Sequence, residues 1–214
     1  SLCVFNAGAQ VQVTATAGNP SFTYTTLNAA FASINNGTHQ GAITINIIGN
    51  TTEPAVSVPL LRSNLPSIYS SILIRPSGGN FTINSAATPT ASRGIIEMFG
   101  ADNVTIDGDD PSTAGTNNLT FQSVTTTSTG IAVIRIASNS TTGTDGATNV
   151  TVKNCNIVGS RPSSTATSTG YGISISNNSA ITTGSFSSNN LLIENNDCTR
   201  CYHGINMPTG GSAS

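Results

Sequence analysis

The side chains best suited to chemistry in this sequence form one acidic turn, Asp107-Gly108-Asp109-Asp110. Carboxylate oxygens are the ligands that calcium prefers, so Asp107, Asp109 and Asp110 are candidate metal ligands. Two such carboxylates could also act as a general acid and base. An Asp-rich turn also forms for a local reason, because Asp hydrogen-bonds to its own backbone there. A solvated turn is the first interpretation, and the cation site and the catalytic pair are its alternatives.

Two tyrosines, Tyr171 and Tyr202, each come just ahead of a segment that begins Gly-Ile. The matching positions predict that they stack on one flank of neighbouring strands. Aromatic faces exposed in a row bind sugar rings, which makes both residues candidate ligands of a polysaccharide, although stacked aromatics also simply stabilise a sheet. His203, beside Tyr202, is interpreted as a loop residue. Arg135 alternates with two isoleucines and is expected to point outward from its strand.

Four cysteines are candidate disulfide partners: Cys3, Cys155, Cys198 and Cys201. The spacing of the last two resembles half of a zinc site, but no second such pair exists, and disulfides or buried thiols are favoured over a metal. Cys3 belongs to the first segment, several strand spacings from the others. We therefore expect it to be free or to pair with a second molecule.

Short alternating strands recur about every 30 to 50 residues, which is typical of a solenoid of stacked repeats. One set begins with Asn and ends in a Gly or Asn turn: residues 103–108, 149–154 and 190–195. The other set begins with Gly-Ile: residues 94–98, 130–134, 172–175 and 204–207. Stacking would place Asn103, Asn149 and Asn190 in a ladder at one corner, where Asn tolerates left-handed backbone angles.

The chain before the repeats predicts an edge strand around Val11 and Val13, followed by one helix. Thr25 or Thr26 is the expected N-cap, and Asn36-Gly37 ends the helix. Its apolar face would cover one end of the core. We expect residues 1–41 to form this edge strand and capping helix. Residues 42–214 would form the stacked strands, with an uncapped C-terminal end.

The composition argues against two classes of function, nucleic-acid binding and membrane insertion. Only 7% of the 214 residues are charged and the net charge is -2, which offers no basic surface for nucleic acid. No apolar run approaches the roughly 18 residues of a membrane span, so membrane insertion is not expected. A chain rich in Ser, Thr and Asn and poor in Lys suits an oxidising extracellular setting.

Three segments resemble the right-handed parallel β-helix regions of large secreted bacterial surface proteins, which have a pectin-lyase-like fold and often a type IX-like export route. These segments are residues 26–38 with 41–53, residues 71–79, and residues 100–108. With this resemblance, the predicted fold class is all-β, a right-handed parallel β-helix (solenoid) with an N-terminal capping helix. The resemblance also implies an extracellular or cell-surface location.

The function expected from these observations is a non-catalytic structural or adhesive module, able to assemble end to end with copies of itself into fibres. No catalytic residue is assigned and no cofactor is required, with calcium the one ion that the acidic turn would suit. The alternatives are a polysaccharide lyase or hydrolase that uses the acidic turn, and a passive glycan-binding module that uses Tyr171 and Tyr202. The resemblance supports the enzyme only by fold, and fold alone does not establish activity.

Overall fold

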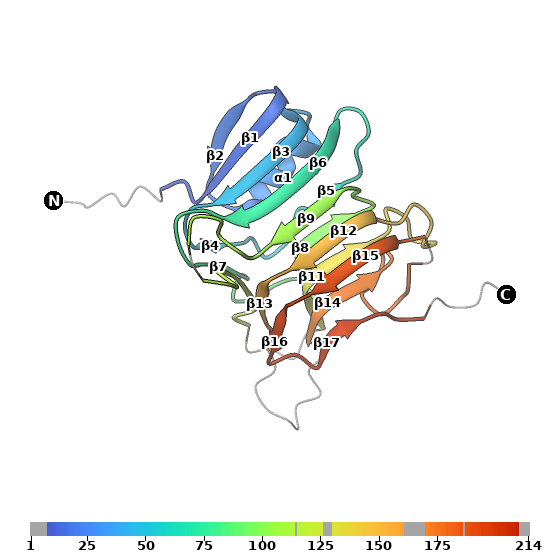
Figure 1. Cartoon of the computed structure of the whole chain (residues 1–214). Coiled ribbons are helices and arrows are strands. Elements are labelled where there is room, and N and C mark those ends of the chain that lie inside the picture. Colours follow the sequence, from blue (N-terminus) through green and yellow to red (C-terminus); the bar gives the residue numbers. More distant parts are fainter. Residues whose placement is uncertain (1–7, 114, 126–129, 161–169, 186, 210–214) are drawn as a thin grey trace.

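The strands of the computed structural model, which describes residues 8–113, 115–125, 130–160, 170–185 and 187–209, form three sheets (Figure 1). Sheet A has the order β15-β12-β9-β6-β3-β1-β2, sheet B the order β16-β13-β10-β7-β4, and sheet C the order β17-β14-β11-β8-β5. From β6 onward the chain supplies one strand to each sheet in turn. Hydrogen-bonded neighbours are therefore three strands apart in the sequence, which matches the recurrence of the repeats.

The bounds of the strands follow. Sheet A contains β1 (Val11–Gly18), β2 (Ser21–Tyr24), β3 (His39–Ile47), β6 (Tyr69–Pro76), β9 (Val104–Asp107), β12 (Thr148–Lys153) and β15 (Asn189–Glu194). Sheet B contains β4 (Thr51–Thr52), β7 (Phe81–Asn84), β10 (Leu119–Gln122), β13 (Cys155–Val158) and β16 (Asp197–Thr199). Sheet C contains β5 (Leu60–Leu61), β8 (Gly94–Phe99), β11 (Ile131–Ala137), β14 (Gly170–Ser176) and β17 (His203–Asn206).

The predicted fold class, a right-handed parallel β-helix, is wrong. The described residues form three separate, mostly parallel sheets and one helix rather than a closed solenoid. Strands pair only within their own sheet, and sheet A ends in antiparallel pairs of β1 with β2 and with β3. The physical reason is that a sequence repeat shows which strands are neighbours but not how they close around the core, and the antiparallel β1 and β2 lie outside the repeats.

The core lies between the sheets and consists of like residues in register. Val104, Val150 and Leu191 are paired neighbours in sheet A, and the first two are completely buried. The predicted asparagine ladder is confirmed beside them. Asn103, Asn149 and Asn190 have φ of 57°, 57° and 50°, and the Asn149 amide donates to Asn103 Oδ1 over 2.9 Å. The Asn190 amide in turn donates to Asn149 Oδ1.

The predicted helix is confirmed as α1 (Leu27–Asn35). Thr26 is the N-cap, and its hydroxyl accepts from Ala29 N at 3.1 Å. Four apolar side chains of the helix are completely buried: Leu27, Ala30, Phe31 and Ile34. The prediction of an edge strand at Val11 and Val13 is wrong, because β1 pairs on both sides and β2 is the edge. Within the described ranges no helix is both long and apolar enough to cross a bilayer.

Candidate interaction face

The last strand of each sheet lies at the same end of the molecule and has one unpaired edge (Figure 1). These strands are β15 of sheet A, β16 of sheet B and β17 of sheet C, and together they define the face that we call the C-terminal face. A free strand edge presents a row of N–H and C=O groups that can pair with another chain. Among the described residues, no other strand pairs with these three edges.

The apolar side chains of the C-terminal face occupy inward positions but are only partly covered. Ile205 is the register partner of Ile173, yet Ile205 is 49% exposed and Ile173 is completely buried. Met207, two residues further along, is 67% exposed. Leu191, Ile193 and Cys198 are likewise only partly buried against the core. At the C-terminal face, the apolar core is therefore partly in contact with solvent, because no described residue covers it.

The two tyrosines that were predicted to stack in a row each contact the ring of His203. Tyr171 pairs with His203 in the strand register, and the two rings stack with centroids 5.8 Å apart and planes 6° apart. Tyr202 packs its edge on the same imidazole, with centroids 4.4 Å apart. Because Tyr171 is only 7% exposed, its face is not available to a sugar ring, whereas Tyr202 is 45% exposed. The three rings form one cluster in which His203 is the central member.

The described cysteines, Cys155, Cys198 and Cys201, are free thiols, and Cys3 lies outside the described residues. Burial raises the pKa of the Cys155 thiol well above its usual value, and nearby Asp107 and Asp109 add to the effect. Burial also raises the pKa of Cys198, and raises that of Cys201 to about 11. A reactive or metal-binding cysteine needs a lowered pKa. The environment of these thiols therefore disfavours thiolate chemistry at neutral pH.

The three aspartates of the acidic turn face different partners. Asp107 Oδ2 lies 3.1 Å from Lys153 Nζ, and Asp109 Oδ1 accepts from Asn117 N at 2.8 Å. Asp110 is buried and holds the neighbouring turn, because its Oδ2 accepts from Gly78 N and Gly79 N at 2.7 and 2.9 Å.

The protonation of two of these carboxylates follows from the same contacts. Hydrogen bonding from the Ser112 side chain, then from backbone amides, lowers the pKa of Asp110 against the opposing effect of burial. Desolvation works to raise the pKa of Asp107, but hydrogen bonds from Asn154, Asp109 N and Lys153 lower it overall. Across the described parts of the chain, no three His, Cys, Asp or Glu side chains form a group that could hold a metal ion.

One buried ionic cluster was not anticipated from the sequence. Arg135 does point away from the core, as expected, but it is completely buried rather than solvated. Its Nη1 lies 3.0 Å from Glu97 Oε1, and Glu97, also completely buried, accepts from Ser57 Oγ at 2.6 Å. Arg93 forms a second ion pair with Glu97. One carboxylate thus faces two guanidinium groups, and carbonyl oxygens of Ser92 and Asn177 accept further hydrogen bonds from Arg135. A buried charge that is paired and hydrogen-bonded in this way is typical of a structural ion pair.

Comparison with protein-family models, with curated proteins and with solved structures found no match. The resemblance to secreted bacterial surface proteins therefore stays a prediction, as do the extracellular location and the assigned export route.

Proposed function

We propose that this chain is a non-catalytic structural module that assembles through its C-terminal face with a second copy of itself. The observation that carries the proposal is the coincidence of three unpaired strand edges with partly exposed core side chains. Addition of strands to such an edge is a general mode of protein recognition. Pairing of two copies would form hydrogen bonds between their free strand edges. It would also bury the partly exposed apolar side chains of both faces.

The charge and the composition of the face support association with a like surface. The three strands carry only two formally charged side chains, Glu194 and Asp197, at the ends of β15 and β16. Natural edge strands resist pairing through lysines, prolines or bulges, and β15, β16 and β17 contain neither a lysine nor a proline. A two-fold arrangement also closes on itself and uses the same patch on both molecules.

The opposite end of the molecule supports pairing of two C-terminal faces over head-to-tail fibres. There, sheets B and C end in β4 and β5, which are only two residues long, and α1 packs against β5. Such short edges offer few hydrogen bonds to the three longer strands of a neighbour. Head-to-tail stacking, the arrangement expected from the sequence, is the alternative outcome of the experiment.

Light scattering coupled to size exclusion over a range of protein concentrations tests the proposal. We expect a concentration-dependent mass of twice the monomer, unaffected by reductant. The Ile205→Lys variant should stay monomeric and folded, because it places a charge at the centre of the interface. Val56→Lys is the matched control, since Val56 is 60% exposed and lies outside the face. A monomer at all concentrations would refute self-association, and filaments in electron micrographs would favour head-to-tail stacking.

A further inference from the structure

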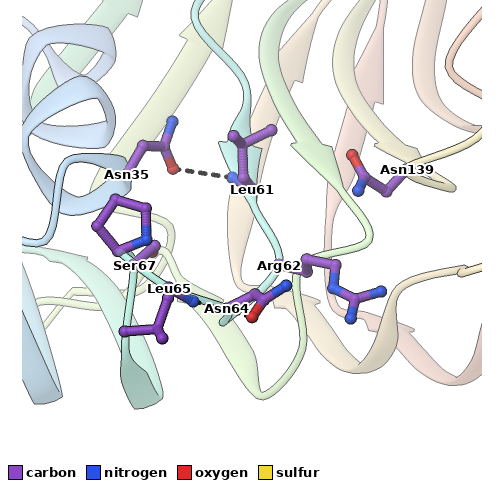
Figure 2. Close-up of a pocket in the computed structure, with 8 residues that line it drawn as sticks. Asn35, Leu61, Arg62, Asn64, Leu65, Ser67 and Asn139 are labelled. Atoms are coloured by element: carbon purple, nitrogen blue, oxygen red, sulfur yellow. Dashed lines mark hydrogen bonds between the residues drawn. The ribbon is translucent and has the colours of Figure 1, made fainter.

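A pocket of about 380 Å³ lies between the C-terminal turn of α1, the segment that links β5 to β6, and the loop after β11 (Figure 2). Asn35 and Asn139 stand on opposite sides of it, with Leu61 between them. This volume is at the lower end of the range for small-molecule sites. None of the residues predicted from the sequence as ligands or catalysts lines this pocket.

The uncharged polar side chains of the pocket are three amides and one hydroxyl. Asn35 is held rigidly, since its amide donates to Pro59 O at 2.8 Å and its Oδ1 accepts from Leu61 N at 3.0 Å. These bonds leave one N–H of the Asn35 side chain to be used. Asn64 Oδ1 accepts from Leu65 N at 2.9 Å, and Asn139 lines the opposite wall. Asparagine amides both donate and accept hydrogen bonds, as do the hydroxyls of a polyol.

Ser67 supplies the second observation. It lines the pocket and is only 3% exposed, and its buried Oγ has no hydrogen-bond partner among the described residues. Buried polar groups are nearly always hydrogen-bonded, so an unpaired hydroxyl at a pocket wall needs an explanation. A rotation about χ1 toward a bound hydroxyl would provide the missing partner.

The charge and the apolar surface define the ligand further. The one cation in the lining, Arg62, is matched by Asp145, with Arg62 Nη1 2.6 Å from Asp145 Oδ1. Among the described residues that line the pocket, no charge is left without a counter-charge that would attract an acid or a base. Leu61, Leu65 and Pro66 contribute an apolar surface beside the amides. Such a surface suits the C–H face of a sugar ring, whose rim carries hydroxyl groups.

We propose that this pocket binds a neutral saccharide, with Asn35, Asn64 and Asn139 hydrogen-bonding its hydroxyls and Leu61 and Pro66 contacting its ring. The site is independent of the C-terminal face. It also differs from the glycan site expected from the sequence, which used Tyr171 and Tyr202.

Titrations of the full chain followed by ¹⁵N NMR test the site, with glucose, galactose, mannose and N-acetylglucosamine as probes and galacturonate as the charged comparison. We expect at least one neutral sugar to give saturable shifts of the Asn35, Asn64 and Asn139 side-chain amides, with a millimolar Kd. Asn139→Ala should weaken binding about tenfold, and it should fold normally because no hydrogen bond of the Asn139 side chain holds the described fold. Ser67→Ala should weaken binding about threefold.

The matched control is Asn19→Ala, which removes an exposed amide between β1 and β2, away from the C-terminal face and the pocket lining, and should leave the affinity unchanged. Absence of saturable shifts with all four neutral sugars would overturn the proposal. Tighter binding of galacturonate than of any neutral sugar would also overturn it, because the ligand class would then be acidic. Equal loss of affinity in Asn139→Ala and Asn19→Ala would place binding elsewhere.

Discussion

The two ends of this molecule contain the same kind of apolar core, but the core is covered at one end and partly exposed at the other. At the N-terminal end, α1 buries Leu27, Phe31 and Ile34 completely. Glu53, which directly follows β4, holds the N-terminus of the helix, because its carboxylate accepts from Leu27 N and Asn28 N at 3.1 and 2.9 Å. At the C-terminal end, Ile205 is 49% exposed in the described structure. Among the described residues, α1 covers the core at the N-terminal end, whereas the C-terminal end leaves strand edges unpaired and Ile205 partly exposed.

Truncation of one large side chain at each end should give the largest contrast. Phe31→Ala removes a fully buried ring and leaves a cavity, so we expect a loss of about 3–5 kcal/mol in the free energy of unfolding. Ile205→Ala should cost less than about 1 kcal/mol in the monomer, since half of its side chain is already solvated. Urea denaturation of dilute protein measures both. Equal losses at this concentration would show that the C-terminal end is covered in the monomer.

A line of register partners across sheet C runs from buried residues in β8 and β11 to the exposed strand β17. It allows a second comparison of buried and exposed positions. Glu97, Arg135, Ser174 and Asn206 are successive register partners. Glu97→Gln leaves the buried Arg135 guanidinium without its counter-charge, and we expect a loss of about 3 kcal/mol. Asn206→Ala should cost under about 1 kcal/mol, because its amide makes only partly buried hydrogen bonds. Denaturation midpoints that fall equally in the two variants would contradict the structural role of the ion pair.

The asparagine ladder offers a smaller effect with a control at the same residue. Asn149→Ala loses hydrogen bonds to both neighbours and forces Ala to φ of 57°, so a loss of about 1–2 kcal/mol is expected. Asn149→Gly should recover the backbone part of that loss. Asn190→Ala, at the C-terminal face, breaks only the bond to Asn149 and should cost less than Asn149→Ala. A larger loss for Asn190→Ala would mean that the end of the ladder contributes more to the free energy of unfolding than its middle.

Much of the strand arrangement could be predicted from the sequence, because each repeat contributes a strand that pairs with the strand of the next repeat. The Asn corners predicted the register of β9, β12 and β15, and the N-cap Thr26 predicted where the helix begins. The Gly-Ile repeats predicted the register of β14 with β17, but not that of β8 with β11, where Gly94 pairs with Ala132. The sheet topology could not be predicted in the same way, since the period of a repeat does not show how strands close around the core. The antiparallel β1 and β2 lie outside the repeats and had no pattern to reveal their partners.

The candidate sites were less predictable, because they depend on contacts between segments far apart in the chain. Arg135 was expected to point outward from alternation alone. Alignment of the Gly-Ile repeats places Val133 beside Glu97, and only the strand register brings Arg135 there. The acidic turn looked like a cluster, but Asp110 serves the Gly78 turn one repeat earlier. The pocket at Asn35 and Asn139 joins residues more than a hundred positions apart. Their polar side chains carried no common motif that could have suggested it.

Thiol reactivity gives the smallest and most local contrast between the two regions. In a Cys3→Ser background, iodoacetamide should leave Cys155 unmodified in the native protein, because it is completely buried with a raised pKa. Cys198 and Cys201, at or beside the C-terminal face, should react slowly at pH 8. The Cys201 rate should rise roughly tenfold per pH unit until about pH 11, since only the thiolate reacts and burial holds the pKa of Cys201 at about 11.

The same labelling also reports on the proposed interface. If two C-terminal faces pair, the Cys198 rate at fixed pH should fall as protein concentration rises, and Ile205→Lys should remove this dependence. Peptide mass spectrometry would separate the three thiols in one experiment. A Cys198 rate that is independent of concentration, together with a dimer in light scattering, would place the interface on another surface. Cys155 labelled as fast as Cys198 would instead mean that the core opens readily, and the contrast between the two ends would lose its basis.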